Sequence, residues 1–277
     1  QTLYESLGLS SIKSWCPAAL ERSPSLLGDA EKYILKPAVG RGSSGISFVT
    51  KDTLIKKLAA NEVDGKSIIQ EYREGVEYRV LVLIKNGEIK ILAPLIRESL
   101  SDTFFLGRLR YSDKDLVILE NYFQSFIERS EATDVILKAD VLVSEFGIDM
   151  IEMDIGVGGG IYYKNYISEL YDYNLIDEYI SLITGVEVQR AGLPDKKLVL
   201  DYIYNSGKCP VLFDMDLVSE KVTSLVGDNV ISKNLLSPER RGGANSNADF
   251  IFTISHKSAA VSNKELNEYI NKNLFYE

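Results

Sequence analysis

Three acidic side chains and a lysine lie close together in two short stretches that could bind a metal ion and phosphate. Lys138 and Asp140 belong to the apolar segment VILKADVLV. Glu152 and Asp154 belong to the next segment, GIDMIEMD, and a turn at residues 144–147 separates the two. Two short apolar segments joined by a turn predict a β-hairpin. Because residues two apart share one face of a strand, the lysine points with Asp140, and Glu152 points with Asp154.

A hairpin that aligned these faces would bring the carboxylates together beside the lysine. Carboxylate oxygens suit Mg²⁺, which typically takes one or two of them together with phosphate oxygens. A glycine-rich turn at residues 156–160 follows directly, and a backbone without side chains can approach a ligand closely. The alternative is a plain strand pair with solvated acids and an ordinary turn.

A second stretch could bind an anion. An apolar run at residues 33–35 leads into Lys36, and the sequence GRGSSG follows at residues 40–45, before another apolar run at residues 46–49. This pattern predicts a hairpin whose tip offers backbone N–H groups, hydroxyls and the arginine of the loop to an anion. It is not a P-loop, because the GK[ST] ending and the following helix are absent. A simple hairpin tip without a ligand is the alternative.

The elements around these stretches follow from periodicity. Residues 51–60 and 114–129 have apolar side chains at helical spacing, and residues 161–184 are also predicted to be mainly helical. Residues 67–72 are predicted to form a strand, and Asn86-Gly87 predicts a hairpin turn between two further strands. Three arginines, Arg97, Arg108 and Arg110, follow in a stretch interpreted as rich in loops. They could meet an anionic substrate, or they could be solvated surface side chains.

The composition changes near residues 186–195, which contain Gly192 and Pro194. Beyond this break, strand and helix patterns alternate, which predicts a small parallel α/β unit over residues 196–277. Residues 238–247 within it are interpreted as a loop.

Composition excludes several classes of protein. A formal net charge of −9 over 277 residues argues against nucleic-acid binding, which needs a basic surface. No stretch approaches the roughly 18 apolar residues of a membrane helix, and no signal peptide is recognisable. Cys16 and Cys209 are distant, which indicates a reducing compartment, and the expected location is the cytoplasm. The single histidine, His256, argues against a His-based metal site and is interpreted as structural or exposed.

Taken together, these stretches resemble the motifs of the ATP-grasp superfamily over roughly residues 1–185. Lys36 before the Gly/Ser loop is similar to the phosphate-binding lysine and the lid of that family. The stretch QEYREGVE, residues 70–77, is similar to its hinge, where the first residues meet adenine and the later glutamate, here Glu77, binds ribose. The Lys138-x-Asp140 step with Glu152-x-Asp154 is similar to its metal site, although the family carries Asn where this chain has Asp154.

The resemblance assigns the following residues to ATP: Lys36, Arg41, Ser43, Ser44, Gly45, Gln70, Glu71, Tyr72, Glu77 and Gly158. It assigns Mg²⁺, with Mn²⁺ as a substitute, to Asp140, Glu152 and Asp154, and it gives catalytic roles to Lys138 and Arg97.

The fold that the resemblance implies has two α+β subdomains that clasp ATP, with a lid at about residues 30–72 inside a domain of residues 1–185. A small Rossmann-like α/β unit at residues 196–277 would follow. Because family members carry such a unit ahead of the lid, we hypothesise a circular permutation; an unrelated module and a truncated chain are the alternatives. The permutation requires residues 196–277 to flank the nucleotide cleft beside residues 1–20.

The implied activity is an ATP- and Mg²⁺-dependent ligation of a small-molecule carboxylate to an amine through an acylphosphate. Two alternatives keep the same fold: a small-molecule kinase, and a non-catalytic nucleotide-binding subunit of a larger synthetase. We expect neither a nucleic-acid nor a membrane partner, and a homodimer is compatible with the sequence.

Overall fold

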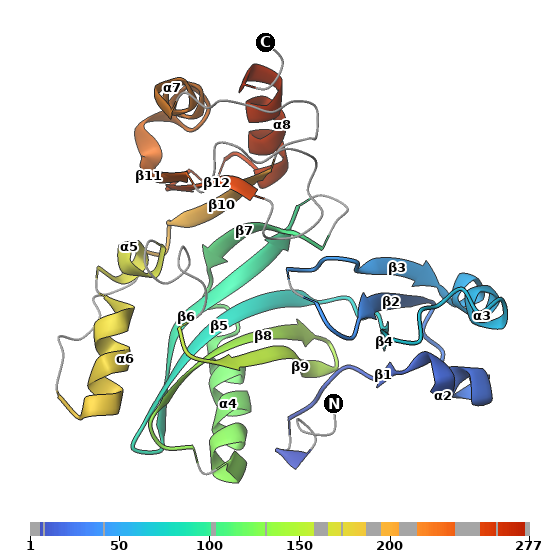
Figure 1. Cartoon of the computed structure of the whole chain (residues 1–277). Coiled ribbons are helices and arrows are strands. Elements are labelled where there is room, and N and C mark those ends of the chain that lie inside the picture. The colour runs from blue at the N-terminus through green and yellow to red at the C-terminus, as the bar shows by residue number, and fades with distance from the viewer. Residues whose placement is uncertain are drawn as a thin grey trace.

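The computed structural model describes residues 6–7, 9–40, 42–100, 104–130, 132–157, 166–172, 174–186, 195–204, 215–235, 250–258 and 260–274. Within these ranges the chain builds a four-stranded sheet and an eight-stranded sheet, here called the small sheet and the large sheet. The two sheets lie side by side and are joined where the chain passes from the fourth strand to the fifth (Figure 1).

The small sheet is antiparallel, with the order β1-β4-β2-β3. Its strands are β1 (Ser14–Trp15), β2 (Lys32–Pro37), β3 (Ser47–Thr50) and β4 (Ser67–Glu71). Three helical segments accompany it: α2 (Pro17–Arg22), η1 (Pro24–Leu26) and α3 (Lys51–Ala59). Thr50 caps α3 by accepting from the backbone N–H of Thr53, and Leu54 and Leu58 are buried, as their helical spacing predicts.

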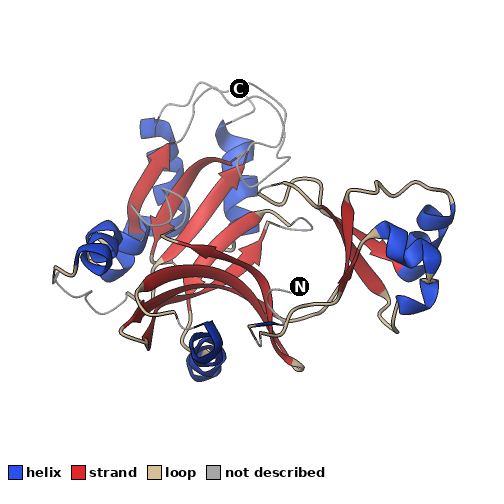
Figure 2. Ribbon diagram, turned by 60° about the horizontal axis from the view of Figure 1, so that its bottom comes forward, coloured by secondary structure: helices blue, strands red, loops and turns tan. Residues whose placement is uncertain are grey.

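The large sheet has the order β11-β12-β10-β7-β6-β5-β8-β9. Its strands are β5 (Val76–Lys85), β6 (Glu88–Ser99), β7 (Leu106–Tyr111), β8 (Val135–Ser144), β9 (Gly147–Ile155), β10 (Val199–Tyr204), β11 (Val230–Leu235) and β12 (Phe250–His256). Helix α4 (Leu116–Ser130) lies against one face of this sheet (Figure 2). Helices α5 (Ser168–Tyr171) and α6 (Leu175–Thr184) accompany the other face.

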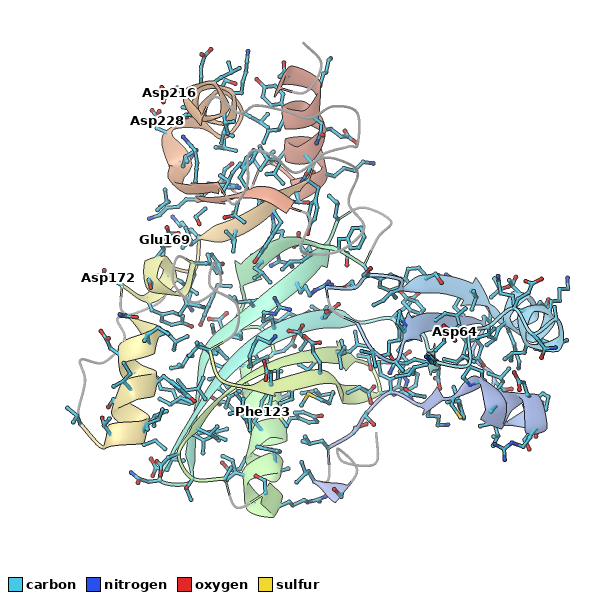
Figure 3. The ribbon with its side chains drawn as sticks, in the orientation of Figure 1. Asp64, Phe123, Glu169, Asp172, Asp216 and Asp228 are labelled. Carbon is cyan, nitrogen blue, oxygen red and sulfur yellow. The ribbon has the colours of Figure 1, made fainter. Side chains whose placement is uncertain are left out.

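Alternation along each strand divides the core into two layers. On the α4 side, Phe123 is 1% exposed and packs among Tyr78, Val80 and Ala139 (Figure 3). On the other side, Leu81 and Leu95 pack with Leu170 of α5. Since successive side chains of a strand point to opposite faces, Glu77 and Arg79 of β5 lie on the face away from α4.

The segment before β1 and the connection after β4 hold the two sheets together. The backbone N–H of Met150 in β9 donates to Ser10 O at 2.8 Å, and the N–H of Glu71 in β4 donates to Lys13 O at 3.0 Å. Gly75 opens β5 where an added Cβ would lie 2.6 Å from Val143 O, so only glycine allows β5 to start this close to β8.

The prediction of a small parallel unit at residues 196–277 is wrong for the strands that the structure describes. β10 pairs antiparallel with both β7 and β12, and β11 pairs antiparallel with β12, so these strands extend the large sheet. Helix α7 (Met215–Val226) and the short η3 (Gly227–Asn229) lie between β10 and β11 in the chain, and α8 (Asn263–Leu274) follows β12. An alternation of strand and helix patterns does not fix the direction in which strands pair. The loop predicted at residues 238–247 lies outside the described residues.

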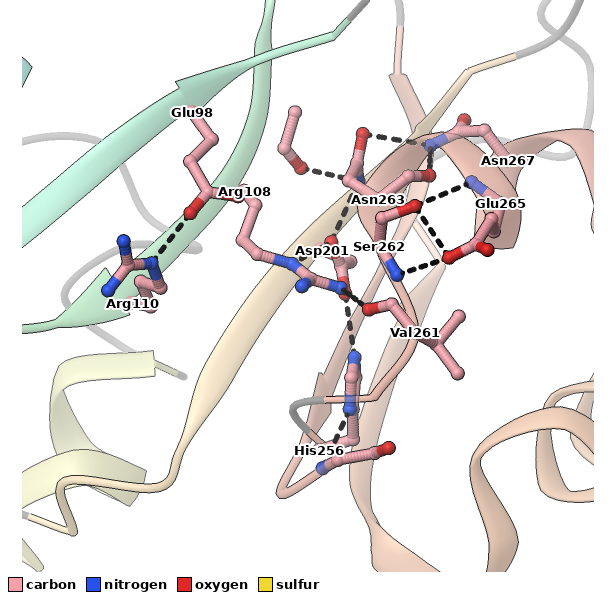
Figure 4. Close-up of polar contacts among 12 residues, drawn as sticks. Glu98, Arg108, Arg110, Asp201, His256, Val261, Ser262, Asn263, Glu265 and Asn267 are labelled. Atoms are coloured by element: carbon pink, nitrogen blue, oxygen red, sulfur yellow. Dashed lines mark hydrogen bonds and ion pairs between the residues drawn. The ribbon is translucent and has the colours of Figure 1, made fainter.

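Buried polar contacts attach this part of the chain to the rest of the large sheet (Figure 4). Arg108 of β7 donates to both oxygens of Asp201 in β10 at 2.8 Å. His256 lies 2.6 Å from the same carboxylate, and Asn263 of α8 donates to it at 2.8 Å. Burial raises the pKa of Asp201, but the bonds from His256 and Arg108 outweigh it and hold that pKa below its usual value.

The circular permutation that we hypothesised is not supported by this arrangement. Residues 10–15 contact β9 and β4, whereas β10, β12 and β11 continue the large sheet at the end opposite to β9. The C-terminal strands therefore do not lie beside the described part of residues 1–20, which the permutation required.

Candidate active site

The acidic hairpin forms with the register that alternation predicts. Across β8 and β9, Lys138 lies opposite Asp154, and Asp140 lies opposite Glu152. Ala139, between the lysine and Asp140, packs on the α4 side, so the four polar side chains share the opposite face. The Lys138 Nζ atom lies 3.6 Å from Glu152 Oε1. We call Asp140, Glu152 and Asp154 the acidic row.

Arg79 of β5 holds the first member of the acidic row. It lies directly opposite Asp140 in the pairing of β5 with β8. Its Nε donates to Asp140 Oδ1 at 2.8 Å, and one terminal nitrogen donates to Oδ2 at 2.6 Å. Asp140 is 4% exposed, and its burial raises its pKa, but the Arg79 charge outweighs this effect and leaves the pKa below the ordinary value. Arg79 was not among the predicted site residues.

Glu77 and Arg97 form a second ion pair beside the first. A terminal nitrogen of Arg97 lies 3.0 Å from Glu77 Oε2, and the other donates to the backbone O of Phe104 at 2.6 Å. Burial raises the pKa of Glu77 above its usual value, and the charge of Arg97 partly opposes this shift. Arg97 therefore sits against the glutamate that is predicted to bind ribose, on the same face as Arg79.

The three arginines interpreted as loop residues all lie in strands, which corrects that interpretation. Arg97 belongs to β6, and Arg108 and Arg110 belong to β7. Arg108 is 6% exposed and points to the opposite face, where it pairs with Asp201, and Arg110 pairs with Glu98. Of the three, only Arg97 shares the face of the acidic row.

The predicted phosphate-binding lysine lies in the small sheet, within electrostatic reach of the acidic row. Lys36 is half-buried near the end of β2, and its Nζ donates to Gln70 Oε1 at 3.0 Å. Burial lowers the pKa of Lys36 below its usual value, and the negative charge of Glu152 partly opposes this shift. The lysine thus lies within electrostatic reach of the acidic row.

The Gly/Ser loop turns sharply between β2 and β3. Gly42, Ser43 and Gly45 have φ values of 62°, 58° and 74°, in the left-handed region. An added Cβ at Gly45 would lie 2.9 Å from the Cγ atom of Pro37, so glycine is required there on two counts. The other predicted residue of this loop, Arg41, lies outside the described residues.

The hinge residues are partly engaged with the protein. The backbone N–H of Tyr72 donates to Lys32 O at 3.0 Å, and that of Glu71 donates to Lys13 O. Gln70 is 8% exposed, and its side chain bonds Lys36 and Ser14. The backbone N–H groups of Glu71 and Tyr72 are therefore already hydrogen-bonded within the protein. A base at this position would contact carbonyl oxygens or side chains instead.

Arg73 lies within the predicted hinge stretch, but the sequence interpretation gave it no role. It donates to Asp149 Oδ2 at 2.6 Å, and its guanidinium lies 5.8 Å from the centre of the Phe146 ring. Asp149 also accepts from Ser10 Oγ at 2.7 Å. These contacts fix the hinge to the turn of the acidic hairpin.

The acidic row fits a metal site with two direct protein ligands better than one with three. In the part of the chain that the structure describes, no group of three or more His, Cys, Asp or Glu side chains is close enough to hold a metal ion. Glu152 and Asp154 are exposed and share one face of β9, which suits a Mg²⁺ ion bound by two carboxylates and phosphate oxygens. Gly158, predicted to lie nearby, falls outside the described residues.

Comparison with known families identifies the fold. A sequence model described as the ATP-grasp domain matches residues 4–163, which is more than half of the chain. The chain belongs to the ATP-grasp family. The predicted ATP-grasp fold, with two α+β parts, is confirmed, apart from the C-terminal strands described above.

Solved ATP-grasp structures resemble this ATP-grasp chain over nearly its whole length. The L-amino acid ligase from Bacillus licheniformis is 13% identical with a TM-score of 0.66, and the match covers 99% of this chain and 70% of the ligase. The N5-carboxyaminoimidazole synthase from Aspergillus clavatus, solved with ADP and 5-aminoimidazole ribonucleotide, is 13% identical with a TM-score of 0.66, covering 97% and 69%. The phosphoribosylglycinamide synthetase from Anaerococcus prevotii is also 13% identical, with a TM-score of 0.58, covering 98% and 70%.

No curated protein sequence matches this ATP-grasp chain. Among the described helices, none is long and apolar enough to cross a membrane.

Proposed function

We propose that this ATP-grasp chain is an ATP- and Mg²⁺-dependent ligase that joins a small-molecule carboxylate to an amine through an acylphosphate. The observation that carries the proposal is the position of Lys36, which bonds Gln70 on the small sheet and lies within electrostatic reach of Glu152 in the acidic row. A cation on one sheet and carboxylates on the other suit a triphosphate with its metal ion between them. The similar structures, which include an amino acid ligase and a synthase solved with ADP, support the same class of reaction.

The nucleotide would lie between the two sheets. Adenine would contact Gln70, Glu71 and Tyr72. These contacts would use carbonyl oxygens or side chains, because the N–H groups of Glu71 and Tyr72 are already hydrogen-bonded within the protein. Glu77, held by Arg97, would accept from the ribose hydroxyls. Lys36 and the turn of the Gly/Ser loop, with Arg41, Ser43, Ser44 and Gly45, would contact the phosphates.

Mg²⁺ would be held by the acidic row and would neutralise charge on the phosphates. The chain's own contribution is positioning and positive charge, which phosphoryl transfer needs more than it needs an acid–base pair. Lys36 from the small sheet and Lys138 from β8 would neutralise the transferring group. Arg97 would keep Glu77 charged and in place.

The reaction has two steps. A carboxylate oxygen of the acid forms a bond to the γ-phosphorus, and the bond to ADP breaks. The amine nitrogen then forms a bond to the acyl carbon, and phosphate leaves with the C–O bonding pair. The proton that the nitrogen loses passes to the departing phosphate or to water. The glycine turn at residues 156–160 would lie against the acylphosphate, which is a prediction for Gly158.

The test is phosphate release from ATP in the presence of panels of acids and amines, compared between the natural chain and two variants. Glu152→Ala should abolish release, whereas Glu128→Ala, an exposed glutamate on α4 at the opposite face, should not change it. Release that needs both an acid and an amine supports the ligase. A stable phosphorylated product without an amine would replace it with a kinase, and nucleotide binding without any release would replace it with a non-catalytic subunit.

A further inference from the structure

We propose that Arg73 and Asp149 form a lock between the two sheets, which sets the small sheet at the distance from the acidic row that magnesium–ATP needs. The lock is one buried carboxylate that holds both of the chain segments crossing between the sheets. Its two residues are positioning residues, because they act through Lys36 and the acidic row rather than on the nucleotide itself. The inference rests on the proposed function, in which ATP lies between the sheets.

The first step is the place of Asp149 on the large sheet. Its neighbours Ile148 and Met150 pack on the α4 side of β9, so the Asp149 side chain points to the face of the acidic row. Asp149 is 2% exposed, and Glu152 of the acidic row follows three positions later on the same strand. A segment that is fixed to Asp149 is therefore fixed relative to the acidic row, because one strand carries both.

The second step is that both crossings between the sheets end on this carboxylate. The segment before β1 reaches it through Ser10, whose Oγ donates to Asp149 Oδ1 at 2.7 Å. The connection after β4 reaches it through Arg73, whose terminal nitrogen donates to Asp149 Oδ2 at 2.6 Å. A hydrogen bond between two charged groups is stronger than one between neutral groups. Each crossing has its own oxygen, so a single side chain ties both crossings to β9.

The third step is that Arg73 contacts both sheets. Its Nε lies 3.4 Å from Oε1 of Glu71, the last residue of β4 in the small sheet. Its guanidinium lies 5.8 Å from the centre of the Phe146 ring, in the turn between β8 and β9. The Arg73 side chain is 19% exposed, so salt screens its charge only partly. Arg73 therefore joins the end of β4 to the hairpin that carries the acidic row.

The fourth step is that loss of the lock should loosen the small sheet without unfolding it. The backbone N–H of Glu71 would still donate to Lys13 O, and that of Met150 would still donate to Ser10 O. Each sheet also keeps its own apolar core. What changes is the fraction of molecules that hold the small sheet at the binding distance. The apparent affinity for a ligand that contacts both sheets falls in proportion to this fraction.

The experiment measures the distance between the sheets directly. Nitroxide labels on Lys56→Cys in α3 and Glu128→Cys in α4, both exposed positions, report this distance by double electron–electron resonance. The labelled parent chain has serine in place of its two native cysteines. The test variants are Arg73→Met, which keeps an apolar stem against the Phe146 ring, and Asp149→Asn, which keeps the shape of the side chain.

Arg110→Met is the matched control. Arg110 pairs with Glu98 at 2.6 Å, the same distance as in the lock, but both partners lie in the large sheet. Arg73→Lys is the conservative variant, because lysine keeps the positive charge but lacks the planar fork of arginine.

We expect one narrow distance distribution in the parent chain and in Arg110→Met. Arg73→Met and Asp149→Asn should give broader distributions that magnesium–ATP narrows again, and Arg73→Lys should lie between them and the parent chain. The dissociation constant for magnesium–ATP, measured by calorimetry, should rise about fivefold in Arg73→Met if the binding-competent fraction falls to about one-fifth. A distribution in Arg73→Met as narrow as in the parent chain would overturn the proposal, as would equal broadening in Arg110→Met.

Two further outcomes separate the inference from the proposed function. If Arg73→Met broadens the distribution but binds magnesium–ATP as tightly as the parent chain, the inference fails and the proposed function stands. If the parent chain itself binds no magnesium–ATP, the proposed function fails and the inference falls with it. Should Arg73→Met not fold, Asp149→Asn and Arg73→Lys decide the question, because each is expected to broaden the distribution and to weaken magnesium–ATP binding.

Discussion

Replacing Lys36 with methionine should weaken the binding of ATP much more than the binding of adenosine. Methionine keeps the length and the apolar stem of the side chain but removes the charge. In the free protein the ammonium group donates a hydrogen bond to Gln70 Oε1 at 3.0 Å, and burial lowers its pKa. Losing that bond costs about 1 kcal/mol, and removing a half-buried charge offsets part of it, so the stability of the variant should change little.

The effect on ATP follows from the phosphate contact. A hydrogen bond to a charged group contributes about 1.5 to 3 kcal/mol, which corresponds to roughly a 10- to 150-fold loss of ATP affinity. Adenosine has no phosphate, so its dissociation constant should change much less than that of ATP. Some change is expected, because the lost bond also frees Gln70, which is proposed to meet adenine. The assay is isothermal titration calorimetry with ATP and Mg²⁺, and separately with adenosine.

A matched control removes the same charge from the same part of the chain. Lys56 is exposed on α3 of the small sheet, and Lys56→Met should bind both ligands as the natural chain does. The reasoning is refuted if Lys36→Met weakens the binding of ATP and of adenosine by the same factor. It is also refuted if Lys56→Met weakens ATP binding as much as Lys36→Met does.

Three further predictions follow from other contacts. Glu77→Gln should reduce the preference for ATP over 2′,3′-dideoxy-ATP, measured as the ratio of their dissociation constants, by roughly tenfold, because the charged acceptor for the ribose hydroxyls is gone. An unchanged ratio would contradict this role. Arg108→Met should lower the free energy of unfolding by about 3 to 5 kcal/mol in denaturant titrations, because Asp201 keeps a buried charge without its arginine. Since the folded pKa of Asp201 lies below its unfolded value of about 3.9, the stability from this group is complete above that pH and is lost as the pH falls toward the folded pKa, so the difference between the two proteins should shrink below about pH 4. Phe104→Ala should increase hydrogen exchange in β3, because the Phe104 ring contacts Phe48 of that strand at 4.1 Å between centres, and equal exchange would show that the contact does not hold the sheets together.

Local patterns in the sequence predicted the parts of the site that lie within single hairpins. Alternation placed Lys138 with Asp140 and Glu152 with Asp154, and the register of β8 and β9 agrees. The helical spacing of Leu54 and Leu58 likewise predicted α3 correctly. Such patterns succeed because side-chain direction depends on a few neighbouring residues.

Contacts between distant segments could not be predicted in the same way. Arg108 and Asp201 are 93 positions apart, and their pairing depends on β10 joining β7 antiparallel, which strand and helix patterns do not specify. Arg79 could have been found, because it lies two residues after Glu77 and alternation puts both on one face. Its partner, Asp140, depends on the pairing of β5 with β8, 61 positions apart.

The measurement that tests the central claim most directly is the unfolding midpoint of the natural chain with ATP, with Mg²⁺ and with both. A ligand that binds only the folded chain raises the midpoint by mass action. With Mg²⁺ and ATP at about 100 times the dissociation constant, stabilisation of about 2.7 kcal/mol corresponds to a rise of about 5 °C or more. We predict this rise with both ligands and a smaller one with ATP alone. No rise with ATP and Mg²⁺ together would contradict the claim that Lys36 and the acidic row form a magnesium–ATP site.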